Sequence, residues 1–176
     1  TTEIAVMSLG GVVFSKSLRV AGDAMDGAII NYMRKKFNLL IGESTAEKIK
    51  KEIGTAIPTS NNVFLMKGRD IRTGTPKEIS LTEEDACEAL MPILSQMLAA
   101  IKEALESTPP ELSADLVDMG LVLTGGGALL KNIDKLISKD TGLPVTIADN
   151  PLECVATGTG KALENEELFS TMLSEY

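Results

Sequence analysis

The segment Leu121-Val-Leu-Thr-Gly-Gly-Gly-Ala-Leu-Leu130 is the most informative part of this sequence. An apolar, β-branched run typical of a strand ends in three consecutive glycines, and apolar residues at helical spacing follow from Ala128 to Ile137. Glycine permits a positive φ and a close backbone approach, and the free N–H groups that open a helix can face a nucleotide sugar or phosphate. The pattern also fits a tight turn in an ordinary α/β domain, and it is neither a Walker A loop nor a G-x-G-x-x-G fingerprint. The glycine turn is therefore a candidate ligand site that needs a second observation.

Composition narrows the class of protein. With 176 residues, of which 44% are hydrophobic and 24% charged, the chain can form one large domain or two small lobes around a real core. Its net charge of −8 argues against nucleic acid or an anionic membrane as a default partner. The absence of histidine excludes a Ser-His-Asp triad, a Cys-His pair and histidine metal ligands. Cys87 and Cys154 form no C-x-x-C motif, so we expect buried free thiols in a reducing compartment and no metal site.

The ends of the sequence carry no targeting signal that we recognise. No apolar run approaches the ~18 residues of a membrane span, and the first residues do not resemble a secretory signal. The sequence opens with Thr1-Thr2-Glu3, directly before a predicted strand and without a methionine. We therefore expect a piece of a longer protein.

Hydrophobic periodicity predicts a mixed series of strands and helices. The series comprises strands over 4–9 and 12–20 joined at Gly10-Gly11, helices over 23–38 and 44–53, a hairpin over 62–71 and 77–81, a helix over 82–106, the glycine-turn unit, a strand over 145–148 and a helix over 151–165. This order predicts an α/β fold. Its core would contain residues 1–20 and 83–165, with 21–82 inserted as a smaller lobe and 166–176 as a C-terminal tail.

Local signals predict where several of these elements begin. Ser44-Thr-Ala-Glu47 and Thr82-Glu-Glu-Asp85 are expected to cap the two helices that they open, the first as a capping box. Thr108-Pro-Pro110 is expected to be a linker, and Pro151 suits the first position of the last helix.

The predicted helix from Ser44 is the second candidate site. Helical geometry places four residues within a face of about 100°, opposite two isoleucines; the four are Glu47, Lys50, Lys51 and Gly54. In a structural interpretation, Glu47 completes the capping box and the lysines are solvated surface charges. In a functional interpretation, Glu47 accepts hydrogen bonds from ribose hydroxyls and Lys50 donates one to the sugar. The aliphatic stem of Lys51 then covers the face of a base, and Gly54 leaves room for the ring.

Together the two sites resemble the actin, sugar kinase and heat-shock chaperone ATPase superfamily, and within it the bacterial actins of the MreB family. The resemblance rests on an ordered series along nearly the whole chain: Thr1-Thr-Glu-Ile-Ala-Val6, Ser8-Leu-Gly-Gly11, Arg19-Val-Ala-Gly-Asp23, Asn38-Leu-Leu-Ile-Gly-Glu43, Ala46-Glu-Lys-Ile-Lys50, Gly68-Arg-Asp70, Gly74-Thr-Pro-Lys77, Leu123-Thr-Gly-Gly-Gly-Ala-Leu-Leu130, Thr141-Gly-Leu-Pro144 and Asp149-Asn-Pro151. It implies half of an actin-like ATPase, with a ribonuclease H-like core lobe called IIA and the smaller inserted α/β lobe called IIB.

The resemblance also assigns site residues. It places Gly125, Gly126, Gly127 and Ala128, with Glu47, Lys50 and Lys51, around ribose and adenine, and Gly22 on the side that faces the phosphates. Thr1 and Thr2 match the end of the family's second phosphate loop, whose Asp-x-Gly-Gly-Gly would lie before residue 1. The family's first domain, with its first phosphate loop, its water-positioning acid and its membrane-contacting loop, is not in this sequence. Because catalysis in the family is divided across a cleft, the resemblance implies no catalytic residue, no metal ligand and no ATPase activity in this chain alone.

The implied function is that of the nucleotide-binding half of a cytoplasmic, ATP-dependent filament protein at the inner face of the membrane. Such a protein directs rod shape and sidewall peptidoglycan synthesis, and it binds ATP with Mg²⁺. The implied partners are further subunits, with lobe IIB against lobe IIA, inner-membrane adaptors of the RodZ type and the cell-wall synthesis machinery. Membrane contact would come only through the absent first domain.

Three alternatives come from the same superfamily: a small-molecule kinase, a chaperone ATPase and a divisome actin such as FtsA. A kinase normally carries an acidic general base in its first domain, and a chaperone continues into a peptide-binding domain. FtsA ends in an amphipathic membrane anchor, whereas residues 164–176 here are acidic with few anchors. The short IIB segment and the motif series favour the MreB family.

Overall fold

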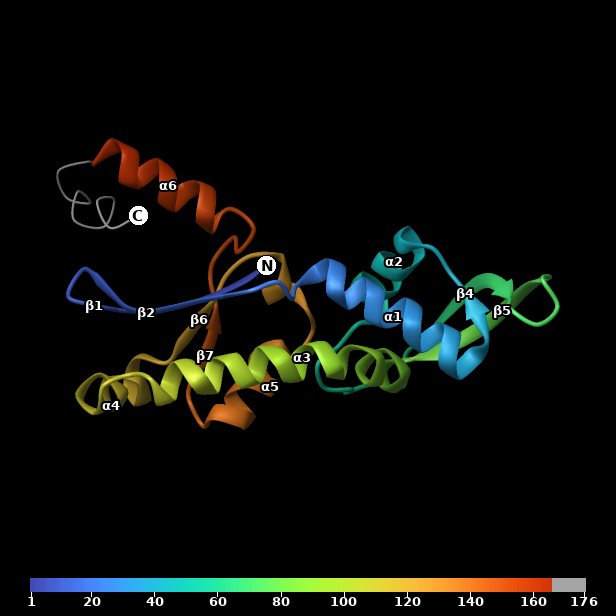
Figure 1. Ribbon diagram of the computed structural model, residues 1–176, viewed down its shortest axis with the longest axis horizontal. Helices are drawn as coiled ribbons and strands as arrows, with labels where there is room; N and C mark the ends of the chain where they lie inside the picture. Colours follow the sequence, from blue (N-terminus) through green and yellow to red (C-terminus); the bar gives the residue numbers. More distant parts are fainter. Residues whose placement is uncertain (166–176) are drawn as a thin grey trace.

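The computed structural model of the protein describes residues 1–165 as an elongated α/β structure (Figure 1). Its elements in chain order are β1 (Thr2–Ser8), β2 (Gly11–Leu18), α1 (Gly22–Phe37), β3 (Leu39–Leu40), α2 (Glu43–Ile53), β4 (Val63–Asp70), β5 (Pro76–Thr82), α3 (Glu83–Glu106), α4 (Pro110–Met119), β6 (Leu121–Leu123), the 3₁₀ helix η1 (Gly126–Leu129), α5 (Ile133–Thr141), β7 (Val145–Ile147) and α6 (Cys154–Glu164). The predicted tail, residues 166–176, lies outside the described part of the chain.

The described strands form three small sheets, and no strand of one sheet pairs with a strand of another among the described residues. β1 and β2 are an antiparallel hairpin, β3, β4 and β5 an antiparallel sheet, and β6 and β7 a parallel pair with Leu121 opposite Val145. The long helix α3 runs along the molecule and packs against α1, β1 and β2, and also against α5 (Figure 1). It is thus the element that joins the sheets into one structure.

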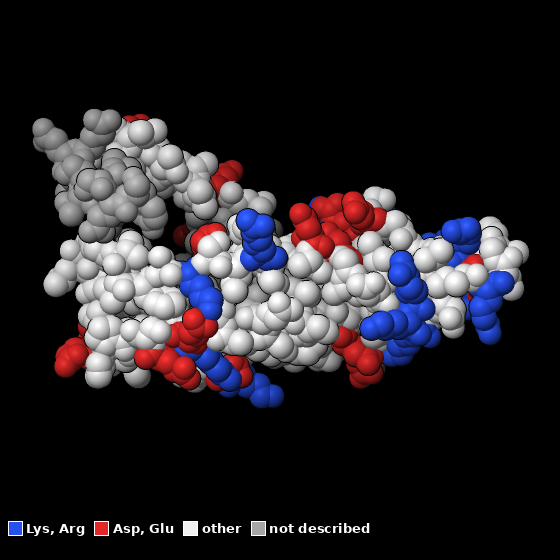
Figure 2. Space-filling view, in the orientation of Figure 1, with Lys and Arg blue, Asp and Glu red and all other residues white. Residues whose placement is uncertain are grey.

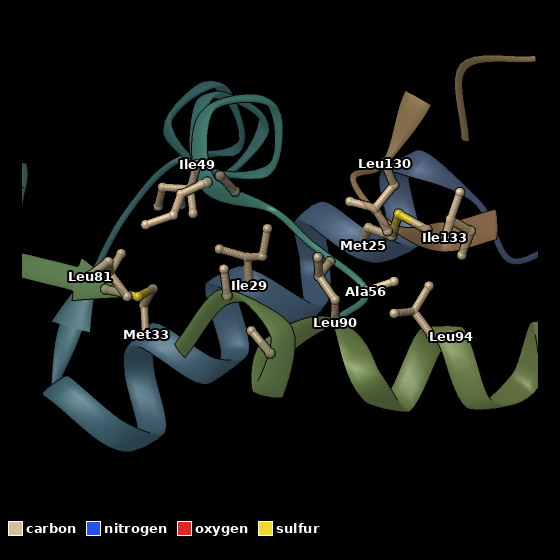
Figure 3. Close-up of a cluster of buried hydrophobic side chains, with 14 of the residues drawn as sticks. Met25, Ile29, Met33, Ile49, Ala56, Leu81, Leu90, Leu94, Leu130 and Ile133 are labelled. Atoms are coloured by element: carbon tan, nitrogen blue, oxygen red, sulfur yellow. The ribbon is translucent and has the colours of Figure 1, made fainter. Parts of the chain in front are cut away.

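One apolar cluster occupies the space between α1, α2 and α3 (Figure 3). Met25, Ile29 and Met33 recur every four residues, so they share one face of α1, and all three are buried. They meet further buried side chains from neighbouring elements: Ile49 of α2, Leu81 of β5, Leu90 and Leu94 of α3, and Leu130 and Ile133 beside η1. Burial of such aliphatic side chains is the main stabilising contribution to the fold.

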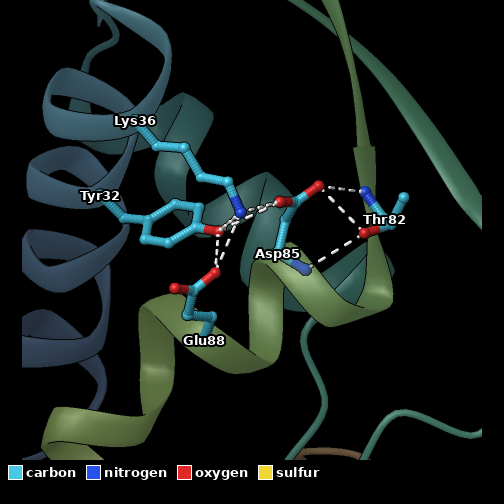
Figure 4. A network of polar contacts seen from close by, with 5 residues as sticks. All are labelled: Tyr32, Lys36, Thr82, Asp85 and Glu88. Carbon is cyan, nitrogen blue, oxygen red and sulfur yellow. Dashed lines mark hydrogen bonds and ion pairs between the residues drawn. The ribbon is translucent and has the colours of Figure 1, made fainter.

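A polar network ties α1 to the start of α3 (Figure 4). The Tyr32 hydroxyl donates to Glu88 Oε2 at 2.6 Å, and Lys36 Nζ lies 2.9 Å from Asp85 Oδ1 and 3.0 Å from Glu88 Oε2. Burial opposes ionisation of Asp85, but hydrogen bonds from Thr82, Lys36 and Tyr32 outweigh it and lower the pKa of that carboxyl. Burial and the hydrogen bond to Glu88 raise the pKa of Tyr32, so the phenol stays protonated at neutral pH.

Basic side chains gather at the end of the molecule formed by β4, β5 and the last turn of α1 (Figure 2). The last turn of α1 carries Arg34, Lys35 and Lys36. Cations at the C-terminal end of a helix interact favourably with its dipole, which accounts for part of this clustering.

Most elements agree with the sequence-based predictions. Both hairpins, α1 and α3 are confirmed to within a few residues. Thr82 caps α3 as expected: its hydroxyl accepts from the Asp85 backbone N–H at 3.2 Å, and Asp85 Oδ2 accepts from the Thr82 backbone N–H at 3.0 Å. This is a reciprocal capping box.

The capping box predicted at Ser44 is wrong. Helix α2 begins at Glu43, and its N-cap is Gly42, which makes no side-chain cap hydrogen bond. Ser44 therefore lies inside the first turn, where its backbone is already helical and its side chain cannot cap. Glu47 instead forms an ion pair with Lys51, one turn further along.

Four predictions in the C-terminal half also need correction. The linker at Thr108-Pro-Pro110 is shorter than expected, because Pro110 opens helix α4, none of whose side chains is fully buried. The helix predicted directly after the glycines is split into η1 and α5, since Asn132 adopts a left-handed conformation with φ of 60°. The last helix begins at Cys154 rather than at Pro151. Cys154 is partly exposed, whereas Cys87 is buried as predicted.

None of the helices described here combines the length and the apolar character that crossing a membrane requires.

We expect Gly27→Ala to raise the free energy of unfolding by about 0.5–1 kcal/mol, since glycine inside a helix costs backbone entropy. Gly27 lies within α1, and an added Cβ would meet nothing within 4 Å. Chemical denaturation of both chains measures the difference. A variant less stable than the original would show that this position has a contact the structure does not contain.

Glu83 is a buried carboxylate that holds the loop before β4. It accepts hydrogen bonds from the backbone N–H groups of Thr59 and Ser60, each at 3.0 Å, and from the Ser60 hydroxyl at 2.8 Å. These bonds, that from Thr59 first, lower the pKa of Glu83 from its ordinary value of 4.5. Because the folded pKa is the lower one, the stabilisation is complete above the unfolded value and is lost as the pH falls through the folded pKa.

We therefore expect Glu83→Gln to lower the free energy of unfolding at pH 7 by about 1–3 kcal/mol. The NH₂ group of the glutamine amide would face N–H and O–H donors of the loop and could not accept their hydrogen bonds. The deficit should begin to shrink as the pH falls below the unfolded pKa of glutamate, about 4.3, and should vanish as the pH falls through the lowered folded pKa of Glu83. Urea denaturation at pH 7 and at a pH below the folded pKa checks this. An equal deficit at both would contradict the assigned role of the charge.

Candidate functional site

The glycine turn presents its backbone to open space. Gly125 has φ of 80° and ψ of 178°, and its N–H donates to the Pro151 carbonyl at 2.7 Å. Gly126 and Gly127 belong to η1 and do not have a positive φ. A Cβ added at Gly125 or Gly127 would meet nothing within 4 Å, and one at Gly126 would touch only Leu152 Cδ2, at 3.4 Å. Gly125 alone therefore requires glycine for its conformation, and all three leave space in front of the turn.

Hydrogen bonds fix the end of η1 beside the end of α2. Thr55 and Lys131 form an isolated parallel bridge, and the Ala56 N–H donates to the Lys131 carbonyl at 2.8 Å. Lys131 Nζ donates to the Glu52 carbonyl at 2.6 Å, and Asn132 Nδ2 donates to Thr55 Oγ1 at 3.1 Å. The structure thus joins the two segments that the sequence singled out, although they lie far apart along the chain.

The predicted exposed face of α2 is only partly exposed. Glu47 and Lys51 lie at the surface, with 50% and 68% of their side chains exposed, and Glu47 Oε1 is 2.7 Å from Lys51 Nζ. The hydrogen bond from Lys51 lowers the pKa of Glu47, and the same contact raises the pKa of Lys51. Both groups are therefore charged at neutral pH, which suits Glu47 for accepting a hydroxyl proton.

Lys50 and Gly54 do not lie on the exposed face of α2 where the sequence predicted them. Lys50 is 17% exposed and turns toward α1, where its Nζ donates to Asp26 Oδ2 at 2.9 Å and to the Gly22 carbonyl at 3.0 Å. Gly54 is buried, and a Cβ there would lie 2.2 Å from the Lys50 carbonyl oxygen. Glycine at position 54 thus serves the close approach of the backbone, and the expected room for a ring is not supported.

A surface pocket of about 190 Å³ lies beside the first turn of α1. Its lining residues come from both strand ends and the helix start: Thr1, Arg19, Ala21, Gly22, Asp23 and Ala24. The Thr2 hydroxyl donates to the Val20 carbonyl at 2.6 Å, which holds the start of β1 against this turn. Thr1 and Gly22 therefore line the same pocket. The glycine turn and Glu47 do not line this pocket.

Sequence reasoning missed Arg19 and Asp26. Arg19 stands in one of the quoted motifs, and its position before the glycine of the turn was a usable signal for an anion site. Asp26 forms an ion pair with Lys50 of α2, and the spacing of residues within α1 gives no indication of a partner on another helix. Among residues 1–165, no three or more His, Cys, Asp or Glu side chains gather as a metal site would require.

The chain is similar to known proteins along most of its length. The family described as MreB/Mbl protein matches residues 1–171. The cell shape-determining protein MreB of Escherichia coli strain K12 is 50% identical over 165 residues, which cover 93% of this chain and 48% of that protein. The cell shape-determining protein Mbl of Bacillus cereus is 49% identical over 166 residues, covering 94% of this chain and 50% of that protein.

A solved structure agrees with these sequence matches. The crystal structure of MreB 5 of Spiroplasma citri bound to AMPPNP matches with a TM-score of 0.89 and 38% identity, over 94% of this chain and 50% of that one. The chain thus spans about half the length of the relatives that it matches. The predicted actin-like α/β fold is confirmed, and the chain belongs to the MreB/Mbl family.

Proposed function

We propose that this chain is the nucleotide-binding half of an actin-like, filament-forming ATPase that determines cell shape and organises sidewall peptidoglycan synthesis. The relatives in Escherichia coli and Bacillus cereus are named cell shape-determining proteins, and the Spiroplasma citri structure contains AMPPNP. The observation that carries the nucleotide site is the Thr55–Lys131 bridge, because it fixes α2 and the glycine turn next to each other.

The ligand we propose is ATP with Mg²⁺, the metal arriving on the phosphates as is common in nucleotide sites. Residues 125–128 would lie against ribose and adenine. Glu47 would accept from ribose hydroxyls, Lys50 would donate to the sugar, and the stem of Lys51 would lie against the base. Gly22, Thr1 and Thr2 would face the phosphates. The basic side chain of Arg19 in the same pocket supports that direction.

We also propose the division into lobes, with residues 1–20 and 83–165 as IIA and residues 21–82 as IIB. The chain leaves the first sheet after β2 and returns with α3, which packs back onto β1 and β2. A segment that departs and returns in this way is typical of an insertion.

The proposed partners are further subunits, with IIB of one against IIA of the next, and RodZ-type adaptors and cell-wall enzymes at the inner face of the membrane. The protein would work in the cytoplasm and touch the membrane through a first domain outside this sequence. Matches to shape-determining proteins along more than nine tenths of the chain favour this function over a small-molecule kinase, a chaperone ATPase or an FtsA-like divisome protein.

The experiment that tests the proposed function is electron microscopy of a family-length protein that carries this chain, with and without ATP. We expect paired, straight filaments that depend on ATP. A protein that binds ATP but stays monomeric at concentrations where its relatives polymerise would contradict the filament function.

The 176-residue chain by itself should hydrolyse no ATP above background. Phosphoryl transfer needs groups on both sides of the phosphate chain to position water and neutralise developing charge, and this chain spans half of its relatives. A phosphate-release assay with the purified chain measures this. Release in proportion to protein concentration would show that the chain holds a complete site.

A further inference from the structure

The Lys50 ammonium has a defined place between two helices. Its Nζ lies 2.9 Å from Asp26 Oδ2 and 3.0 Å from the Gly22 carbonyl oxygen, and both acceptors belong to α1. An ammonium has three N–H donors, so these two bonds leave one for another acceptor. The Gly22 carbonyl belongs to the turn that lines the pocket with Thr1 and Arg19. The charge of Lys50 is therefore held beside that turn instead of moving freely over the surface of α2.

Asp26 is the residue that holds it there. The carboxylate is 14% exposed, and among the described residues its Oδ1 is buried without a hydrogen-bond partner. The ion pair with Lys50 is thus the contact that offsets the cost of burying this charge. An interaction this sheltered from water is directional and weakly screened by salt, unlike the exposed pair of Glu47 and Lys51.

Gly22 restricts the ammonium from the other side. A Cβ added at Gly22 would lie 3.3 Å from Lys50 Nζ, so the ammonium would have to shift by a few tenths of an ångström. Gly27, in the same helix, has open space around the same position. The two glycines thus offer a matched pair of substitutions, of which one touches the ammonium.

We propose that Asp26 is a positioning residue for nucleotide binding: with the Gly22 carbonyl it directs the remaining N–H of Lys50 toward an oxygen of the bound nucleotide. This inference rests on the proposed function. It changes the role expected for Lys50, whose ammonium acts beside the phosphate-facing turn. It also adds Asp26 to a proposed site in which α1 is otherwise represented by Gly22.

The test is titration of AMPPNP against a family-length protein that carries this chain, with melting curves for every variant. We expect Asp26→Asn and Gly22→Ala each to weaken binding about tenfold, since each misplaces a charged donor. The matched controls are Asp115→Asn on the exposed helix α4 and Gly27→Ala on α1, and both should leave affinity unchanged. If Asp26→Asn bound as tightly as Asp115→Asn, the inference would be overturned.

A double-mutant cycle shows whether Asp26 acts through Lys50. Lys50→Met alone should weaken binding, and adding Asp26→Asn to it should cause no further loss. If Asp26→Asn weakened binding equally on both backgrounds, its role would be structural and the inference wrong. If Lys50→Met had no effect on affinity, Lys50 would not contact the nucleotide and the inference would be overturned, while the contacts proposed for the glycine turn and Glu47 would still stand.

Lys50→Met leaves the Asp26 charge buried and unpaired, so this variant is expected to melt early. The double variant Lys50→Met/Asp26→Asn removes both charges, and it replaces the single variant in the titration if Lys50→Met does not fold. On the background of this double variant, Gly22→Ala should not change the affinity for AMPPNP. A further loss there would show that Gly22 acts independently of the ammonium and would overturn the proposal.

Discussion

Replacing Gly125 by valine should lower the free energy of unfolding of the chain by about 3 kcal/mol and abolish nucleotide binding. With φ of 80° and ψ of 178°, Gly125 occupies a region that is open almost only to glycine. The turn cannot relax easily, because the Gly125 N–H donates to the Pro151 carbonyl at 2.7 Å and so anchors the segment before α6. A β-branched side chain adds to the strain.

Urea denaturation of the 176-residue chain measures the loss of stability. Gly127→Val is the matched control, because Gly127 lacks a positive φ and has open space at its Cβ position. The control should lose less than about 1 kcal/mol. Equal stabilities for the two variants would mean that the Gly125 backbone is not constrained as the structure shows.

Gly126→Val should leave the chain folded and reduce the affinity for ATP at least about a hundredfold. The backbone of Gly126 suits other residues, and an added Cβ meets only Leu152 Cδ2, at the ordinary contact distance of 3.4 Å. The branched methyl groups would instead occupy the space in front of the turn, where we place the ribose. Loss of one sugar contact together with steric exclusion is enough for a change of this size.

Titration of ATP against a family-length protein with this substitution, beside a melting curve, measures the effect. A variant that melts normally and binds ATP with unchanged affinity would show that the three glycines form only a tight turn.

The elements predicted well are those whose local signals agree with their packing. The four-residue repeat of Met25, Ile29 and Met33 defines α1, and the glycine pair before Val12 defines the first hairpin. Thr82 and Asp85 form the cap that their spacing indicates. In each case the same residues satisfy local geometry and bury apolar surface, so that no competing interaction displaces them.

The failures arose where a local signal competed with another. Ser44 and Glu47 have the spacing of a capping box, but α2 already begins at Glu43 with Gly42 as its N-cap, two residues before Ser44. Helix α4 was not predicted, although Leu112, Leu116 and Met119 stand at helical spacing, because the two prolines before it indicate a linker. Asn132 in a left-handed conformation interrupts an apolar pattern that otherwise continues through Leu136.

The candidate site was predictable in its parts and not in its connections. The glycine turn and the charged face of α2 could be found from residue types and helical spacing. The bridge between Thr55 and Lys131, and the pairing of Lys50 with Asp26, depend on how distant segments pack together. A single sequence carries no direct record of such contacts, and they emerge only from the folded core.

In the proposed function, α2 and the glycine turn form two walls of one adenosine site. Photolabelling a family-length protein with 8-azido-ATP, followed by mass spectrometry of its peptides, tests this most directly. We expect ATP-protectable label within residues 43–54 and 121–131, and loss of that label in Gly126→Val. Protectable label confined to other segments, with none on either of these two, would contradict it.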